Sequence, residues 1–508
     1  MLTIDNNKDI SILDVVKVAR GHEKVSLSDS AKQAIAKSRT FVEKIFDENE
    51  VVYGISTGFG EFSKITINGN DRERLQRNLI LSHCVGVGDL FSPDVVRGIM
   101  LLRVNSLARG YSGIRLIAVE KLIELLGKNI IPAVPQKGSV GASGDLAPLS
   151  HVAAVLLGEG FVLEGGKPVP AAPVLKKANF EPIELAAKEG LALINGTQAM
   201  TSVAALVCYD AMHLMKLADI AAGLSLEALR GTRKAFDLRI AAIRRHHGQA
   251  LCAENILKLT EKSSIMESHE CCEKVQDAYS LRCASQVHGA SRDALRRVEE
   301  TLSIEMNAVT DNPIVMADTG EIISAGNFHG QPVALVMDYF KTALAEIGNI
   351  SERRINRLVD PHLSGLPAFL TNEGGVNSGL MIAQYTAASL VSENKVLVHP
   401  ASADSIPTSA NQEDHVSMGT IAARQAREIL ENVRYVLSVE LMAAAQGIDF
   451  LEGIFPGKGT NAAHKHIRSL VPHLGEDRIL SPDIEAIYGA IVDESLVAQV
   501  EKAIGVLN

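Results

Sequence analysis

Residues 336–350 read VMDYFKTALAEIGNI, and this stretch sets the expected fold class. Its apolar side chains recur in steps of four and three, at Val336, Phe340, Leu344, Ile347 and Ile350. An α-helix has about 3.6 residues per turn, so this spacing places them on one face. Residues 333–360 contain no proline that would interrupt the helix. The stretch therefore predicts a long helix with one buried face.

The same pattern returns further along the chain, and the composition agrees with it. Apolar residues recur at helical spacing at Ala422, Ala426, Ile429, Val433 and Val436. Aromatic residues make up 4% of the chain and tryptophan is absent, whereas hydrophobic residues make up 46%. A core of Ala, Leu, Ile and Val suits packed helices better than aromatic-rich strands. Long helices should therefore dominate the C-terminal three-fifths of the chain.

Shorter sequence patterns predict one further helix in the N-terminal part of the chain and two hairpins. The run Ser92-Pro93-Asp94 supplies an N-cap, a first-turn proline and a first-turn acid ahead of a helical apolar pattern. Glycine-containing turns lie in the middle of residues 161–169 and 313–323, and each segment reads as a small β-hairpin. We expect a mainly α fold: a long-helix bundle with a loop-rich N-terminal domain and small β-hairpins.

The length allows two or three structural units. At roughly 150 residues per domain, 508 residues correspond to about three domains or to one unusually large helical core. No flexible linker is evident, so we place a single soft boundary near residue 200. We expect residues 1–200 to form a domain that carries the functional loops, and residues 201–508 to form a helical bundle used for oligomerisation.

Charge and cysteine content exclude several classes of protein. Lys and Arg number 50 against 60 Asp and Glu, a net charge of −10, so no nucleic-acid partner is expected. Six cysteines and the start MLTIDNNKDI, which lacks a signal-peptide pattern, favour the cytoplasm. The longest uncharged stretch, residues 191–209, contains Asn195, Thr197 and Gln198. It predicts a buried helix of a soluble protein, with no membrane partner.

Three segments place Gly, Ser and Asn where a helical protein would normally have short turns: residues 53–60, 138–145 and 195–198. Such loops usually carry function. The middle one admits two interpretations. Ser143 or Asp145 could cap the following helix. Alternatively, the amide nitrogen of Gly144 could attack the carbonyl carbon of Ala142 and close a five-membered ring, and loss of water from Ser143 would leave an electrophilic methylidene group.

Recognisable motifs favour the second interpretation. Residues 138–151, GSVGASGDLAPLSH, resemble the signature of the ammonia-lyases that build a 4-methylideneimidazole-5-one group from their own Ala-Ser-Gly. Further motifs of this family follow in the expected order along the chain: YGISTGFG at 53–60, LILSHCVGVG at 79–88, INGTQAM at 194–200, VQDAYSLRC at 275–283, NAVTDNP at 307–313, GNFHGQP at 326–332, SERRI at 351–355 and SANQEDHVSM at 409–418.

The resemblance implies a role for each matching residue. Ala142, Ser143 and Gly144 would form the prosthetic group, so no external cofactor is expected. Tyr53 and Tyr279 resemble the two tyrosines assigned to acid–base work. The remaining matches concern binding: Asn195 would hold the ring carbonyl or the substrate amine, Arg282 would pair with the substrate carboxylate, and Phe328 would pack beside the prosthetic ring.

The substrate depends on two further positions. Family members that act on phenylalanine have an apolar residue at the position of His83. The pair His83 and Glu413 resembles the residues found in members that act on histidine. The expected reaction converts L-histidine to trans-urocanate and ammonia, as the first step of histidine degradation. A phenylalanine or tyrosine lyase or aminomutase, or a non-catalytic helical scaffold, is the alternative. Which of Tyr53, Tyr279 and Glu413 accepts the β-proton stays open.

The resemblance also implies a homotetramer whose active sites gather residues from more than one subunit. No metal is expected, because the cluster SHECCE at residues 268–273 lacks the second histidine of an H-E-x-x-H zinc motif.

Overall fold

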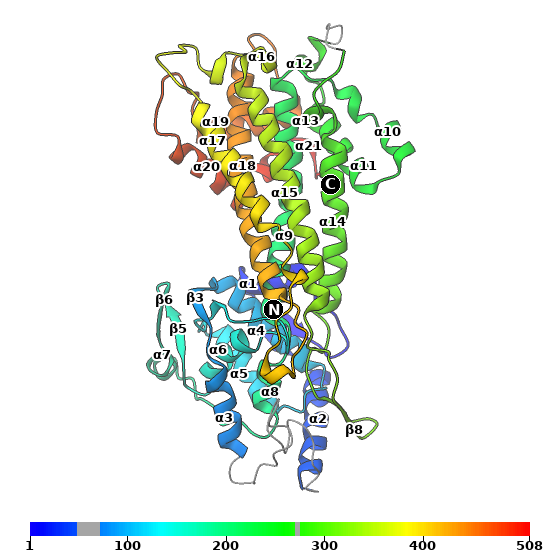
Figure 1. The fold of residues 1–508 in the computed structure, drawn as a ribbon, viewed down its shortest axis with the longest axis vertical. Coiled ribbons are helices and arrows are strands. Elements are labelled where there is room, and N and C mark those ends of the chain that lie inside the picture. The colour runs from blue at the N-terminus through cyan, green and yellow to red at the C-terminus, as the bar shows by residue number, and fades with distance from the viewer. Residues whose placement is uncertain (48–71, 270–274) are drawn as a thin grey trace. The chain divides into compact units, whose positions relative to one another are not determined.

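The computed structural model describes residues 1–47, 72–269 and 275–508, and most of these residues are helical (Figure 1). The chain forms two compact units, each assembled from three chain segments. Unit 1 comprises Met1–Tyr209, Glu299–Asp338 and Pro400–Arg424, and unit 2 comprises Asp210–Val298, Tyr339–His399 and Gln425–Asn508. The boundary that we placed at residue 200 lies within helix α9 (Gln198–Ala228). A role of residues 201–508 in oligomerisation stays a prediction.

The described residues of unit 1 form helices and four two-stranded sheets. Its helices up to residue 209 are α1 (Ile12–Ala19), α2 (Asp29–Asp47), α3 (Arg72–His83), α4 (Pro93–Ala108), α5 (Leu116–Gly127), α6 (Leu146–Leu156), α7 (Ala171–Lys177), α8 (Glu189–Ile194) and the start of α9. The sheets pair β1 (Leu2–Ile4) with β2 (Val25–Leu27), β3 (Val87–Leu90) with β4 (Pro135–Lys137), β5 (Phe161–Glu164) with β6 (Lys167–Pro170), and β7 (Ile314–Met316) with β8 (Glu321–Ile323). The last two sheets are antiparallel hairpins, so both predicted hairpins are confirmed.

Helix α4 is buried along nearly its whole length, and its start differs in one detail from the prediction. Every residue from Val95 to Ala108 is buried. Ser92 is the N-cap and Pro93 occupies the first turn, as predicted. The Ser92 hydroxyl, however, donates to the side chain of Asp94 instead of capping a backbone N–H. The helix is therefore held mainly by burial.

The uncharged stretch at residues 191–209 is buried as predicted, but it is not one helix. Helix α8 ends at Ile194 and α9 begins at Gln198. Between them Asn195 has an extended backbone, and Gly196 has a φ of +156°. A Cβ at Gly196 would meet Thr310 Oγ1 at 2.8 Å, so the chain passes too close to its neighbours for a side chain. The break exposes polar backbone groups beside the loop at residues 138–145.

Unit 2 is a helical bundle, and the predicted periodicity is confirmed there (Figure 1). Parts of α9, α14 (Ala284–Glu305), α15 (Gln331–Val359) and α18 (Gly419–Asp449) run through it. Phe340, Leu344 and Ile347 on α15 are fully buried, as are Ile429 and Val433 on α18.

Shorter helices complete unit 2: α10 (Leu238–Arg244), α11 (His247–Leu259), α12 (Ser264–Glu267), α13 (Tyr279–Arg282), α16 (Pro361–Ser364), α17 (Met381–Leu397), α19 (Lys458–Leu470), α20 (Ser481–Val492) and α21 (Ser495–Ile504). Single turns of 3-10 helix occur in both units: η3 (Arg233–Phe236), η4 (Ala368–Leu370), η5 (Ala401–Ala403) and η6 (Ser409–Asn411). Within the described residues, none of the helices combines the length and the apolar character needed to cross a membrane.

Buried ionic groups join the long helices of unit 2. Arg354 on α15 donates to Glu440 on α18 through Nε at 2.5 Å and Nη2 at 2.9 Å, and both side chains are fully buried. Ser225 on α9 and Ser351 on α15 donate to the same carboxylate, each at 2.6 Å. Because every one of these buried groups is paired, the network fixes the positions of three helices relative to one another.

Candidate active site

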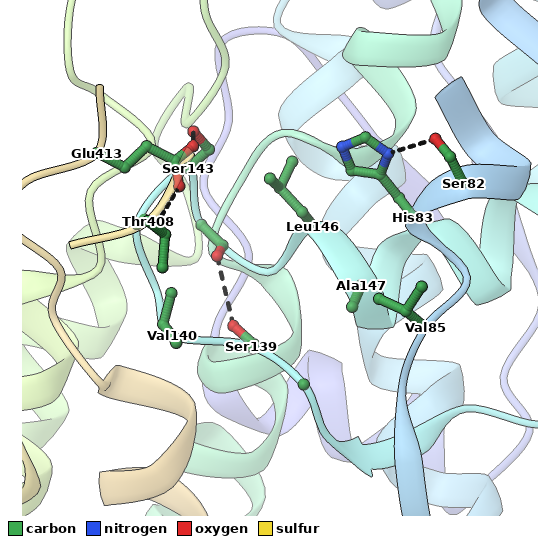
Figure 2. Close-up of a pocket in the computed structure, with 13 residues that line it drawn as sticks. Ser82, His83, Val85, Ser139, Val140, Ser143, Leu146, Ala147, Thr408 and Glu413 are labelled. Atoms are coloured by element: carbon green, nitrogen blue, oxygen red, sulfur yellow. Dashed lines mark hydrogen bonds between the residues drawn. The ribbon is translucent and has the colours of Figure 1, made fainter. Parts of the chain in front are cut away.

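A cavity of about 270 Å³ in unit 1 collects several of the predicted residues (Figure 2). Its wall consists of three chain segments that are distant in sequence: the end of α3, the loop that precedes α6, and the segment around Glu413. The lining residues are Ser82, His83, Val85, Gly138, Ser139, Val140, Ala142, Ser143, Gly144, Leu146, Ala147, Thr408 and Glu413. The structure thus brings His83, Ser143 and Glu413 to one cavity.

Close backbone contact shapes the loop at Ala142-Ser143-Gly144. Gly144 has a φ of +69°, a left-handed conformation that favours glycine. A Cβ at this position would also collide with the backbone of Gly196, whose carbonyl oxygen accepts from the N–H of Asp145 at 2.7 Å. Ala142 is buried. The loop is therefore compressed at the residue whose amide would close the ring, which fits the proposed cyclisation.

Asp145 stands at the N-cap position of α6, and its side chain anchors this loop to α9. Its Oδ2 accepts from the backbone N–H of Met200 at 2.8 Å, and its Oδ1 accepts from the hydroxyls of Ser139, at 2.9 Å, and Thr420. The side chain is fully buried, and this burial raises the pKa of the carboxyl above its ordinary value, although the three donors oppose the change. Asp145 occupies the N-cap position of α6, but neither its side chain nor that of Ser143 makes a capping hydrogen bond.

The segment after residue 416 closes the loop from the other side. Ser417 Oγ donates to the carbonyl of Gly141 at 2.9 Å, and the backbone N–H of Met418 donates to the carbonyl of Val140 at 2.8 Å. Val416, Met418 and Ala142 share a small buried apolar cluster. The loop is therefore held by backbone and side-chain contacts on both flanks.

Ser143, Glu413 and Thr408 form a hydrogen-bonded row along one wall of the cavity (Figure 2). Ser143 Oγ donates to Glu413 Oε1 at 2.9 Å. Thr408 Oγ1 donates to Glu413 Oε2 at 2.8 Å. Both oxygens of the carboxylate are therefore engaged, and the residue that would give rise to the methylidene group is one hydrogen bond away from Glu413.

His83 stands across the cavity from this row (Figure 2). Its Nδ1 lies 3.1 Å from the hydroxyl of Ser82. Burial lowers the pKa of His83 below its ordinary value of 6.5, and a hydrogen bond to the backbone of Leu79 and the negative charge of Glu413 only partly offset this effect. Burial therefore favours the neutral imidazole, and one ring nitrogen of His83 is directed away from Ser82 (Figure 2).

Asn195 lies beneath the loop, in the break between α8 and α9. Its Nδ2 donates to the carbonyl of Asn312 at 3.1 Å, whereas its Oδ1 is buried and has no hydrogen-bond partner among the residues that the structure describes. Arg103 braces the same turn by donating to the carbonyl of Asn195 and to Gln198 Oε1, both at 2.9 Å. An unpaired buried acceptor is unfavourable. Asn195 Oδ1 is therefore suited to accept an N–H from a bound group, although Asn195 does not line the cavity.

The other predicted residues lie elsewhere. Phe328 is half-buried in unit 1 and is not part of the cavity wall. Tyr279 and Arg282 belong to helix α13 of unit 2, where the Arg282 guanidinium lies 4.6 Å from the centre of the Tyr279 ring. Tyr279 is 71% exposed. Tyr53 lies outside the described residues.

Sequence reasoning missed several polar residues around the cavity. Thr408 was not singled out, because a lone threonine five positions before Glu413 carries no local signal. Ser139 and Thr420 were missed for the same reason. Thr197 Oγ1 donates to Glu305 Oε1 at 2.5 Å, and burial raises the pKa of that carboxyl. These partners become visible only when distant segments meet.

Metal-ligating side chains also meet in unit 2. In the part of the chain that the structure describes, one group of three has its ligand atoms within 4.8 Å of one another: Asp219, Cys252 and His288. Cys252 and His288 both donate to Asp219 Oδ1, at 2.9 and 2.8 Å. Arg292 donates to Asp219 Oδ2 at 2.5 Å. Because a guanidinium already neutralises the carboxylate, we assign this group to helix packing. The expectation that no metal takes part stays a prediction.

The geometry agrees with a comparison against known families. Residues 10–469 match the model of the aromatic amino acid lyases. The chain therefore belongs to the aromatic amino acid lyase family, and it is an enzyme of the carbon–nitrogen lyase class.

Individual relatives are similar over their whole length. The chain is 54% identical to a histidine ammonia-lyase of Alkaliphilus oremlandii, with 98% of each chain covered. It is 53% identical to a histidine ammonia-lyase of Caldanaerobacter subterraneus, with 100% of this chain and 99% of the other covered. Among solved structures, histidine ammonia-lyase from Trypanosoma cruzi superposes with a TM-score of 0.92 at 41% identity, covering 99% of this chain and 96% of the other. Tyrosine aminomutase from Streptomyces globisporus has a TM-score of 0.93 at 38% identity, with both chains fully covered. The mainly helical fold is thereby confirmed.

Proposed function

We propose that this lyase eliminates ammonia from L-histidine to give trans-urocanate, the first step of histidine degradation. The observation that carries the proposal is the meeting of His83, Ser143 and Glu413 in one cavity of amino-acid size. The relatives named histidine ammonia-lyase support it, because they are 49–54% identical to this chain over nearly its whole length.

The loop fits the prosthetic group that the family motif implies. Gly144 accepts no side chain, Ala142 is buried, and Ser143 lines the cavity. We infer that these three residues form 4-methylideneimidazole-5-one without an external cofactor. The group supplies an electrophile that makes the substrate amine a better leaving group. Helix α6 begins directly after the loop, so the positive end of its dipole adds to the electron demand there.

His83 and Glu413 select the substrate ring. Glu413 offers an ionisable carboxylate that can accept from an imidazole N–H, and neutral His83 offers a ring nitrogen from the opposite side (Figure 2). Phenylalanine would leave both groups unpaired in a half-buried site. A site built to hydrogen-bond its substrate can reject the analogue that lacks the polar group by roughly 10⁴-fold to 10⁵-fold.

The remaining residues position the amino-acid end of the substrate. We assign the substrate carboxylate to Arg282, whose planar guanidinium can make two parallel hydrogen bonds. Because Arg282 does not line the cavity, this assignment requires the proposed assembly, whose active sites gather residues from more than one subunit. Asn195 Oδ1 would accept from the amine or from a bound N–H, and Phe328 would pack beside the reacting group. Tyr53, Tyr279 and Glu413 are the candidates for the group that accepts the β-proton.

We further propose a cytoplasmic homotetramer with no nucleic-acid or membrane partner. The net charge of −10 supports the absence of a nucleic-acid partner. Helix α17 of unit 2 displays exposed apolar side chains, such as Tyr385 at 63% and Val396 at 68%, which suit helix association. Sedimentation of the purified enzyme tests this assembly, and a fully active monomer would contradict it.

The second candidate is a tyrosine or phenylalanine enzyme of the same family. The similarity to tyrosine aminomutase, at 38% identity over the full chain, is the observation that favours it. Family membership excludes the non-catalytic scaffold. Incubation with L-histidine, L-phenylalanine and L-tyrosine distinguishes the remaining possibilities, because the conjugated lyase products absorb in the ultraviolet and a β-amino acid is separable by chromatography. Preference for either phenylalanine or tyrosine would refute the proposed substrate.

A further inference from the structure

Thr408 and Glu413 are joined by both backbone and side chain. The backbone N–H of Thr408 donates to the carbonyl of Glu413 at 2.9 Å, and the N–H of Glu413 returns a bond to the carbonyl of Thr408 at 3.3 Å. The hydroxyl of Thr408 adds the third bond, to Glu413 Oε2 at 2.8 Å. The two residues therefore close a short loop, and both of them line the cavity.

The loop between them has an unfavourable backbone. Ser409, Ala410 and Asn411 have φ values of +52°, +52° and +67°, which place three consecutive residues in the left-handed region. Residues with a Cβ rarely adopt this conformation, and a consecutive run is rarer still. All three are exposed, so no burial of their side chains stabilises the turn. The turn is held by the backbone bond from the Gln412 N–H to the carbonyl of Ser409 at 3.0 Å and by the three bonds between Thr408 and Glu413.

The other partner of Glu413 is Ser143, and that bond is temporary if our proposed function is right. Ser143 donates to Oε1 through its hydroxyl. Formation of the prosthetic group removes this hydroxyl as water, so Oε1 loses its donor and becomes available to the substrate. Oε2 keeps its bond to Thr408, because Thr408 takes no part in that chemistry.

We propose that Thr408 is a positioning residue that holds the carboxylate of Glu413 by Oε2 and leaves Oε1 directed at the substrate. The inference rests on the proposed function. A carboxylate on a flexible side chain has several accessible rotamers, and one fixed oxygen restricts the other to a narrow set of directions. Thr408 thus acts through Glu413 without contacting the reacting atoms itself.

The test compares three variants of the full-length enzyme. Thr408→Val keeps the shape and removes the hydroxyl, and Thr408→Ser keeps the hydroxyl. Ser405→Ala is the matched control, since Ser405 Oγ accepts from the backbone N–H of Val416 at 3.1 Å and belongs to the same segment without touching Glu413. Steady-state kcat and KM for L-histidine and the Kd for trans-urocanate by calorimetry are measured for each.

We expect Thr408→Val to lower kcat/KM about tenfold to a hundredfold, the usual effect of removing a hydrogen bond to a charged group. The affinity for trans-urocanate should fall with it. Thr408→Ser and Ser405→Ala should stay within about threefold of the wild type on both measures. Near-ultraviolet absorption of the prosthetic group should be unchanged in all three, which separates this role from a role in forming that group.

A double-mutant cycle identifies the residue through which Thr408 acts. In a Glu413→Gln background, adding Thr408→Val should change kcat/KM, or the Kd for trans-urocanate where turnover is too slow, by less than about threefold. The proposal is overturned if Thr408→Val has its full effect in the Glu413→Gln background. It is also overturned if the single Thr408→Val variant is as active as the wild type. A Thr408→Ser enzyme as impaired as Thr408→Val overturns it as well. A wild type inactive on L-histidine would instead refute the proposed function.

Discussion

The backbone N–H of Asp145 donates to the carbonyl oxygen of Gly196 at 2.7 Å, and this bond joins the two loops that build the site. Gly144 lies directly beneath it, paired with Gly196 in an isolated β-bridge. The side chain of Asp145 continues the connection to the first turn of α9 through Met200. The loop that would form the electrophile therefore packs directly against the loop that holds Asn195.

Replacing Gly144 by Ala should prevent formation of the prosthetic group. The new Cβ would collide with Gly196 in a left-handed backbone, so we expect a loss of about 2 kcal/mol or more in the free energy of unfolding. Chemical denaturation and near-ultraviolet absorption measure the two effects. Gly166→Ala is the control, because Gly166 has a φ of +78° with open space around it and should lose only about 1 kcal/mol. Equal losses in both variants would contradict the packing argument.

Replacing Ser143 by Ala should abolish turnover while leaving the fold intact. The hydroxyl of Ser143 and its bond to Glu413 are lost in any case when the prosthetic group forms, so the variant should differ from the wild type by no more than the roughly 1 to 3 kcal/mol of a single hydrogen bond. Loss of the electrophile should lower the rate by several powers of ten, each about 1.4 kcal/mol of barrier. Activity assays with L-histidine measure the rate, and inactivation by borohydride measures the presence of the electrophile. Comparable turnover in the variant would show that Ser143 is not the source of the prosthetic group.

Replacing His83 by Leu together with Glu413 by Gln should remove the preference for histidine. Both residues line the cavity, and the double variant loses the two groups suited to an imidazole. We expect kcat/KM for L-histidine to fall by about 10³-fold or more, and any activity on L-phenylalanine to fall far less. The unfolding midpoint should change little in comparison. A double variant that still prefers histidine would disprove the assignment of specificity to this pair.

Stability should depend on pH through His83. Burial lowers the pKa of His83 in the folded state below 6.5, whereas the unfolded state retains that ordinary value. As pH falls through 6.5 the unfolded state binds a proton that the folded state does not, so the free energy of unfolding decreases. The decrease continues until the folded-state pKa is reached.

Thermal unfolding of wild type and His83→Leu between pH 7.5 and 5.5 measures this contribution. The wild type should lose more stability over this range than the variant. Burial also lowers the pKa of His151, but His151 is present in both proteins and its effect cancels in the difference. Identical pH dependence in the two proteins would show that His83 does not titrate as its environment indicates.

Periodicity and local motifs allowed much of this molecule to be predicted. The spacing from Val336 to Ile350 predicted helix α15, and the glycine-containing turns predicted both hairpins. Such patterns are local, because a helix or a hairpin is formed by residues close in sequence. The run Ala142-Ser143-Gly144 is local in the same sense, since all atoms of the expected ring belong to three consecutive residues.

Long-range contacts could not be predicted in this way. Helix α8 stops at Ile194 because Gly196 must approach Thr310 and Gly144, which are distant in sequence. Asp145 resembles a helix cap in the sequence, yet its carboxylate turns away to bind Thr420, 275 positions later.

The sequence by itself therefore determined the helical class and the hairpins, and it supplied the candidate for the reactive loop, because each depends on neighbouring residues. The tertiary structure alone decided which groups face that loop. It placed Glu413 against Ser143 and Thr408 against Glu413, since a hydrogen bond between such segments depends on how the whole of unit 1 packs.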